Sequence, residues 1–238
     1  MKALTYLIFS ICILLGCSSH LTHQKAKESA ESTDTVEADT AKILRLTEED
    51  YERVAKELNI DVATMKAVVE IEAGAAHEGF AAPGIPIVNF DATIFRRFMA
   101  KAGKSVSKHA GSVAFQRPNM RRHGSFGLAQ WARLESARTI DEPLAESATF
   151  WGMFQIGGFN WKLCGCKSLD EFVTRMSTSE AEQLEIFAVF IKNTKLLPYL
   201  QQKNWSKFAY HYNGPSYKSR GYDRKLRAAY VKHSQKAK

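Results

Sequence analysis

Residues Phe150–Asn160 read FWGMFQIGGFN, with four aromatic residues, three glycines and two side-chain amides. The stretch is too rich in glycine for a helix, and its apolar residues do not alternate as they do in a half-buried strand. Glycines let the backbone approach another surface closely, and aromatic rings with amides suit a ligand with apolar ring faces and many hydroxyl groups, such as a sugar. The alternative is a buried turn in which the glycines make room for packed rings.

A second stretch has the same character. Residues 211–217 read HYNGPSY and combine aromatic and amide side chains with a turn signal. Since glycine and proline mark a turn between the polar groups, the two stretches suggest two walls of one groove, although they are far apart in the chain.

Most of the remaining pattern is helical. Thr47–Asp50 (TEED) resembles a capping box, and Asp61 is placed to cap the helix that follows, which Gly74 would end. Apolar residues at helical spacing predict helices over 47–58, 62–73, 92–102, 130–140, 168–176, 180–194 and 206–212. Residues 85–90 (IPIVNF) and the stretch 150–160 are the best candidates for extended segments. The predicted fold class is mainly α (α+β), with a small irregular sheet beside a substrate cleft.

The amino terminus reads as a signal segment. One lysine precedes an apolar run from Ala3 to Leu15, shorter than the roughly 20 residues that span a bilayer. The run ends in Leu-Leu-Gly-Cys17, which resembles a bacterial lipobox, in which the chain is cut before the cysteine and the cysteine is lipidated. The alternative is a plain signal peptide with an incidental Cys17. Residues 1–17 are therefore predicted to be a lipoprotein signal peptide ending in the lipidated Cys17.

Residues 18–43 have the composition of a tether. The segment has no aromatic residues and few large apolar ones, so it cannot bury enough surface to offset the entropy of ordering. A flexible coil of this length has a typical end-to-end distance of roughly 25 to 30 Å. Residues 44–238 then form one folded domain of ordinary size. The predicted location is the bacterial cell envelope, with a lipid anchor in a membrane that faces the periplasm.

The chain is basic, with a formal net charge of +8. The tether holds more acidic than basic residues, so the folded part is more basic still. Such a charge is compatible with nucleic acid, but an envelope location makes an anionic cell-wall polymer the better partner. The predicted partners are peptidoglycan strands and, through Cys17, the membrane; the predicted oligomeric state is a monomer.

Two glutamates near the end of the helix at 62–73 differ in position. At 100° per residue, Glu72 lies within about 40° of Met65 and Val68 on the apolar stripe. Glu70 lies on the other side, where it can pair with Lys66 at i−4. A buried carboxyl group stays protonated near neutral pH, as an acid that cleaves glycosidic bonds requires. Glu72 is therefore the candidate acid, and the alternative is that it reaches solvent at a frayed helix end.

The other chemistry-bearing residues are less informative. Asp91 follows a possible strand and precedes a helix, so it can be a helix N-cap as well as a catalytic carboxylate. Cys164 and Cys166 would close a very small, strained disulfide ring, and no histidine or second cysteine pair lies near enough to suggest zinc. We interpret both cysteines as packing residues or a local redox pair, and we predict neither a metal nor a cofactor.

Several motifs together resemble one family. AVVEIEAG (67–74), PIVNFDATIF (86–95), FWGMFQIGGFNWKLCG (150–165), QLEIFAVFIK (183–192) and AYHYNGPSYKSRGYDRKLRAAY (209–230) follow the order seen in the N-acetylmuramidase family related to phage endolysins. The resemblance covers about Leu46–Tyr230. More distantly, the layout resembles goose-type lysozymes and soluble lytic transglycosylases. It implies a lysozyme-like domain and cleavage between N-acetylmuramic acid and N-acetylglucosamine, with Glu72 as the catalytic acid.

The resemblance also assigns the remaining site residues. It implies that FWGMFQIGGFN forms a cleft wall in which Trp151, Phe154 and Gln155 bind substrate. Tyr212 and Asn213 of the second aromatic stretch are expected to bind substrate as well, and Asp91 is the candidate second carboxylate.

The chain departs from the family at three positions. Ala73 stands where serine is common, Asp91 where glutamate is typical, and Phe150 where a small residue usually precedes Trp-Gly. Ala73 removes a hydroxyl near the acid, and Asp91 retracts a carboxylate by one methylene.

Two other functions remain open at this point. A lytic transglycosylase needs only one catalytic carboxyl group, because the 6-hydroxyl of the sugar replaces water. A catalytically weak wall-binding lipoprotein would use the same groove without cutting, and Ala73 and Asp91 keep that reading open.

The lipobox gives a direct prediction. Because the thiol of Cys17 would carry the acyl chains, Cys17→Ala should abolish fatty-acid labelling and move the protein out of the detergent phase. Labelling of the variant at the wild-type level would contradict the anchor.

Overall fold

The computed structural model describes residues 45–73, 78–109, 112–117 and 127–236. The predicted signal peptide, Cys17, the tether at 18–43 and Gly74 lie outside the described residues. No helix in the described part of the chain is long and apolar enough to cross a membrane.

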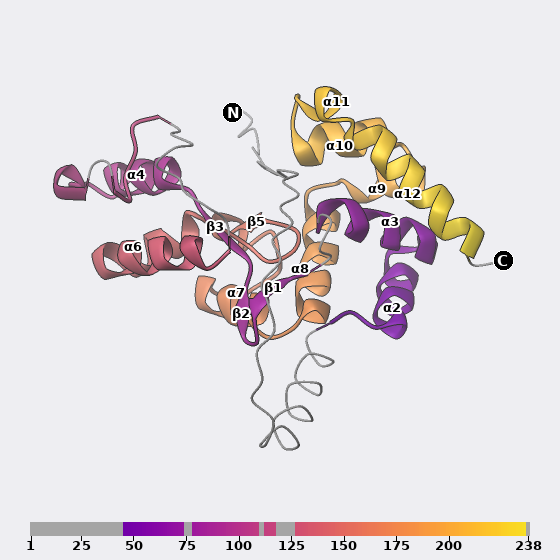
Figure 1. The fold of residues 1–238 in the computed structure, drawn as a ribbon, viewed down its shortest axis with the longest axis horizontal. Coiled ribbons are helices and arrows are strands. Elements are labelled where there is room, and N and C mark those ends of the chain that lie inside the picture. Colours follow the sequence, from indigo (N-terminus) through magenta and orange to yellow (C-terminus); the bar gives the residue numbers. More distant parts are fainter. Residues whose placement is uncertain (1–44, 74–77, 110–111, 118–126, 237–238) are drawn as a thin grey trace, which may run out of the picture.

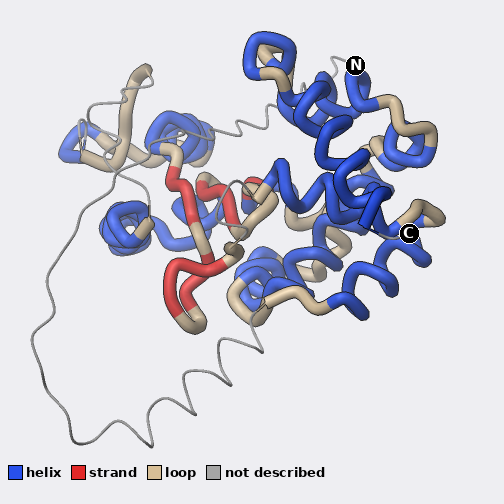
Figure 2. Tube along the Cα trace, turned by 45° about the vertical axis from the view of Figure 1, so that its right-hand side comes forward, coloured by secondary structure: helices blue, strands red, loops and turns tan. Residues whose placement is uncertain are grey.

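Helices dominate the fold, as the sequence predicts. The longer helices are α2 (Glu48–Leu58), α3 (Val62–Glu72), α4 (Ala92–Lys101), α6 (Leu128–Ser147), α7 (Leu169–Met176), α8 (Glu180–Asn193), α10 (Trp205–Asn213) and α12 (Tyr222–Lys236). Shorter helices are α9 (Leu197–Gln201), α11 (Tyr217–Arg220), η1 (Ser107–His109) and η2 (Gly158–Asn160). The strands lie between two groups of helices (Figure 2).

The strands form two small antiparallel sheets. β1 (Phe80–Ala82) pairs with β2 (Ile85–Pro86), and β4 (Thr149–Trp151) lies between β3 (Val88–Phe90) and β5 (Ile156–Gly157). Asn89 faces Phe150 in the register of the larger sheet, and Phe150 faces Gly157. The prediction of extended segments at 85–90 and within 150–160 is confirmed. The 152–155 turn joins β4 to β5.

The helix predictions hold at most of their boundaries. Thr47 forms the capping box with Asp50, and Asp61 caps α3 by accepting from the Thr64 amide. α6 is longer than predicted and continues past non-helical Asp141 to Ser147. The predictions missed α9 and α11, which span only 5 and 4 residues and are too short to show a helical period. They also missed α12, where polar residues interrupt the apolar pattern.

The two groups of helices pack on different elements. α12 lies along α3 and also contacts α10, on the right of Figure 1, whereas α6 packs on β3 and α4 on the left. α8 links the two, since it contacts α2 on one side and α7 on the other. The buried aromatic residues of this core include Phe90, Phe95, Phe154, Phe187, Phe208 and Tyr212.

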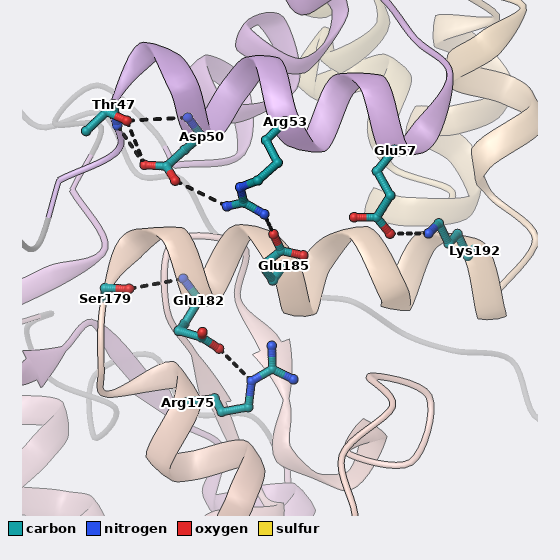
Figure 3. A network of polar contacts seen from close by, with 9 residues as sticks. All are labelled: Thr47, Asp50, Arg53, Glu57, Arg175, Ser179, Glu182, Glu185 and Lys192. Atoms are coloured by element: carbon teal, nitrogen blue, oxygen red, sulfur yellow. Dashed lines mark hydrogen bonds and ion pairs between the residues drawn. The ribbon is translucent and has the colours of Figure 1, made fainter.

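Ion pairs join α2 to α8 across their exposed edges. Arg53 bridges Asp50 of its own helix and Glu185 of α8, and Glu57 pairs with Lys192 (Figure 3). Such exposed pairs contribute little to stability, and the buried apolar contacts between the helices supply most of it.

One predicted pair is wrong. Glu70 does not pair with Lys66, which bonds to Glu48 instead, 2.7 Å away. The Glu70 carboxylate accepts from Lys232 Nζ at 2.8 Å and lies 2.8 Å from His233 Nε2, both on α12. The spacing within one helix could not show this partner, because it comes from a helix about 160 residues further along the chain.

The α3 to α12 contact can be tested by stability. The side chains of Glu70 and His233 are 22% and 17% exposed, whereas those of Glu57 and Lys192 are 42% and 35% exposed. Glu70→Gln should therefore lower the free energy of unfolding by about 1 kcal/mol in urea denaturation, and Glu57→Gln by less than about 0.5 kcal/mol. If both substitutions lower the free energy of unfolding equally, the contact of Glu70 with α12 is no stronger than the exposed pair of Glu57 with Lys192.

Candidate active site

Glu72 is the last residue of α3 and is buried. The residue is 4% exposed, and Met65 and Val68 on the same side of the helix are fully buried. The prediction that Glu72 lies on the apolar stripe is confirmed, and the alternative of a carboxylate in solvent is wrong. The helix therefore ends by placing a carboxyl group inside the domain.

Asn213 at the end of α10 bonds to this carboxyl group. Its Nδ2 donates to Glu72 Oε1 at 3.0 Å, and Asn213 itself is 6% exposed. Burial raises the pKa of Glu72 to about 7, and the bond from Asn213 opposes this by favouring the charged form. Because Oε1 accepts from the amide, the proton of the neutral acid belongs on Oε2. The group can thus serve as an acid near neutral pH.

Tyr212 connects Asn213 to the 152–155 turn. The Tyr212 hydroxyl donates to the Phe154 carbonyl at 2.8 Å, and the ring is fully buried. Phe154 stacks on Phe187 of α8 with 4.2 Å between centroids, and Tyr212 meets the same ring edge-on. Three distant segments, at 72, 152–155 and 212–213, are therefore brought together, as the two-wall hypothesis requires.

Gln155 lies in this turn with a left-handed backbone. Its φ is 47°, and its Nε2 donates to the Gly152 carbonyl at 2.8 Å. Gly152 has a φ of 67°, which a residue with a Cβ atom rarely adopts. The Gln155 amide thus closes the turn in this structure, and the side chain is only partly buried.

The predicted aromatic contacts with substrate conflict with the structure. Trp151, Phe154 and Tyr212 are 0%, 1% and 0% exposed, so their rings present no open face to a ligand. Trp151 Nε1 donates to the Glu146 carbonyl at 3.1 Å, and its ring packs edge-on against Trp131. The physical reason is packing: these rings fill the core beneath the turn. They hold the backbone that carries Gln155 and Asn213.

Asp91 caps α4. Its Oδ1 accepts from the amides of Thr93 and Ile94 at 2.8 and 2.9 Å and from the Thr93 hydroxyl at 2.6 Å. The helix-cap reading is therefore confirmed. No hydrogen bond within the described residues joins Asp91 to Glu72 or Asn213, and its catalytic role stays a prediction.

Cys164 and Cys166 are buried free thiols. Burial raises the pKa of Cys164 and of Cys166, which keeps both in the unreactive thiol form and fits the packing interpretation. In the part of the chain that the structure describes, no group of three or more histidine, cysteine, aspartate or glutamate residues could hold a metal ion.

Sequence reasoning missed two buried polar residues of α8. Glu180 is 4% exposed and Gln183 is fully buried, and both bond to the backbone of other segments. The available signal was a glutamine facing an otherwise apolar helix (QLEIFAVFI), since a buried amide needs partners.

A family model and a solved structure match most of this chain. A family model described as N-acetylmuramidase matches residues 61–234, which include Glu72, Asp91, the 152–155 turn and Asn213. Among solved structures, the crystal structure of Burkholderia AP3 phage endolysin matches with 37% sequence identity and a TM-score of 0.74. The match covers 82% of this chain and 72% of that chain. A search of curated proteins found no match.

The buried acid makes stability depend on pH. The pKa of Glu72 is about 7 in the fold against an ordinary value of 4.5. The stability that its neutral form contributes is complete below pH 4.5 and is lost as the pH rises through 7. Glu72→Gln stays neutral, so its free energy of unfolding should rise relative to wild type by about 3 kcal/mol between pH 4 and pH 8.

Chemical denaturation of both proteins across this range measures the difference. If the difference in free energy of unfolding between Glu72→Gln and wild type does not change with pH, Glu72 has the pKa of an ordinary glutamate.

Proposed function

The chain belongs to the N-acetylmuramidase family, and we propose that it hydrolyses the bond between N-acetylmuramic acid and N-acetylglucosamine in peptidoglycan. Membership of this family supports a peptidoglycan hydrolase in general. The observation that carries the finer proposal is the buried Glu72, whose pKa is raised to about 7 and whose Oε1 is held by Asn213.

In the proposed reaction Glu72 is the general acid. Its Oε2 proton passes to the oxygen that leaves the cut glycosidic bond, and the ring carbon of the other sugar acquires positive character. Burial keeps the proton on Glu72 until the bond breaks, because water does not stabilise the carboxylate there. Asn213 then stabilises the charge on Oε1, so its hydrogen bond strengthens as the reaction proceeds.

Asn213 and Gln155 are the proposed sugar contacts. Asn213 Oδ1 is buried and has no hydrogen-bond partner in the described part of the chain. A buried acceptor without a partner is costly, and a sugar amide or hydroxyl would relieve that cost. Gln155 lies in the adjoining turn and is only partly buried, so an incoming glycan can compete with its bond to Gly152.

Asp91 is the proposed second carboxylate. Hydrolysis needs a water at the ring carbon, and a base across the sugar from Glu72 would activate it. Since Asp91 Oδ1 accepts three hydrogen bonds, only Oδ2 is left for that task. The shorter side chain of aspartate favours a separation that leaves room for water, and hence inversion of the sugar configuration.

One observation favours a lytic transglycosylase as the second candidate. Asp91 is engaged as a helix cap, whereas Glu72 is buried and poised as an acid. An enzyme with one working carboxyl group could let the 6-hydroxyl of the sugar attack in place of water. A weak wall-binding protein is the third reading, and it predicts binding without product.

The proposed location is the cell envelope. The signal peptide, the lipidated Cys17 and the polar segment 18–43 would tether a monomeric domain to the membrane. The net charge of +8 would favour its approach to an anionic cell wall.

Product chemistry tests the proposed function. Wild-type protein should release fragments of purified peptidoglycan with a reducible N-acetylmuramic acid end, which borohydride converts to the alcohol. Glu72→Gln should lower the rate at least about 10²-fold, because the proton source is lost while the shape is kept. Glu70→Gln is the matched control from the same helix and should keep most of the rate.

Three other outcomes would contradict the proposed function. Fragments with a 1,6-anhydro ring that resist borohydride would establish the transglycosylase and leave Asp91 as a cap. Wild-type rates in Glu72→Gln would remove Glu72 from the chemistry, and binding without any product would favour the weak binder.

A further inference from the structure

Gln183 joins three segments of the chain through one buried side chain. Its Nε2 donates to the Gly79 carbonyl at 3.2 Å and to the Met176 carbonyl at 2.8 Å. Its Oε1 accepts from the Met153 amide at 2.8 Å. Because an amide has two N–H donors and one carbonyl acceptor, every polar atom of this fully buried side chain is used.

Two glycines make this contact possible. A Cβ atom on Gly152 would lie 2.6 Å from Gln183 Cδ and Oε1, and one on Gly79 would lie 2.5 Å from Oε1. A Cβ atom at either position would force Gln183 to shift and so to lose its hydrogen bonds, which favours glycine at both positions. Gly152 is the glycine of the Trp-Gly pair in the 152–155 turn. Its contact with Gln183 favours glycine at this position independently of its positive φ.

The same contact holds Gly79. Gly79 lies seven residues after Glu72, and Glu180 of α8 accepts from its amide at 2.8 Å while Gln183 donates to its carbonyl. Ile87 connects this segment to the turn, because its amide donates to Gly79 and its carbonyl accepts from Gly152. Gly79 and the turn therefore keep a fixed separation.

From the turn a series of bonds leads to the acid. Met153 precedes Phe154, whose carbonyl accepts from the Tyr212 hydroxyl. Asn213 follows Tyr212 and donates to Glu72. A shift of the turn would move Phe154 and Tyr212, and with them the amide that holds Glu72 Oε1.

We propose that Gln183 is a positioning residue for catalysis: its bond to Met153 fixes the 152–155 turn, and through Tyr212 it sets the place of Asn213 against Glu72. This inference rests on the proposed function, since it takes Glu72 as the acid. No hydrogen bond in the described part of the chain joins Gln183 to Glu72 or Asn213, so its effect is carried by the turn.

Two substitutions separate positioning from stability. Gln183→Met keeps the length of the side chain and loses all three hydrogen bonds. Gln183→Glu keeps an acceptor for the Met153 amide but, when ionised, donates to neither Gly79 nor Met176, and it lies one turn from Glu180. Both variants should therefore melt at lower temperature than wild type, and Gln183→Glu is expected to be at least as unstable as Gln183→Met.

The catalytic rates should rank differently from the stabilities. Gln183→Met should lower kcat on peptidoglycan about 10-fold, since small misplacements of catalytic groups are costly, and Gln183→Glu should stay within about threefold of wild type. Rates are compared well below the lowest Tm. If rates follow Tm in both variants, or if neither variant folds, Gln183 is a folding residue and the positioning role is rejected.

A double-mutant cycle tests the route. If Gln183 acts through Asn213, then Gln183→Met should lower kcat less than about twofold in an Asn213→Ala background. Independent, multiplying effects would contradict the proposal. Gln201→Met is the matched control: Gln201 donates to the Leu58 carbonyl at 3.0 Å, away from the turn, and its substitution should leave kcat within about twofold.

Failure of the proposed function can be distinguished from failure of the positioning role. In that case Glu72→Gln would keep its activity, whatever the Gln183 variants do. An inactive Glu72→Gln together with a fully active Gln183→Met would reject the positioning role alone.

Discussion

The burial of one carboxyl group constrains much of this structure. An ionised glutamate inside an apolar domain is costly, and Glu72 avoids that cost by staying protonated up to about pH 7. The domain must then keep water away from the end of α3 and still supply one hydrogen bond, from Asn213, to a group that would otherwise be unsatisfied. α12 packs along α3 and its two pairs with Glu70 hold the last turns of that helix, while α10 ends where its final residue meets Glu72.

The aromatic core serves the same requirement. Phe187 of α8 stacks on Phe154 and meets Tyr212 edge-on, so one ring supports both the 152–155 turn and α10. Buried rings have few alternative positions in a densely packed interior, which makes the placement of Asn213 precise without any direct contact between the rings and a ligand. Glu180 and Gln183 of α8 add specific hydrogen bonds to this packing, because they accept from the Gly79 and Met153 amides.

Much of this arrangement could be predicted from the sequence. Glu72 was identifiable because helical phasing places it with Met65 and Val68, and Asp61 and Thr47 are caps by residue type and spacing. The roles of Trp151, Phe154 and Tyr212 could not be identified from the sequence. Composition shows that aromatic rings gather near a turn, but it does not show whether they face a ligand or the core. The partners of Glu70 and Gln183 could not be found either, because both come from segments distant in the chain, and local spacing carries no information about them.

Glu72 should be a neutral acid in the folded protein at pH values where ordinary glutamates are ionised. A ¹³C NMR titration of the Glu side-chain carboxyl groups measures this directly, with Glu72→Gln used to assign the signal. We expect one carboxyl group, whose signal is missing in the variant, to titrate with a midpoint near 7. A midpoint for Glu72 at about 4 to 5, the range of ordinary glutamates, would contradict it.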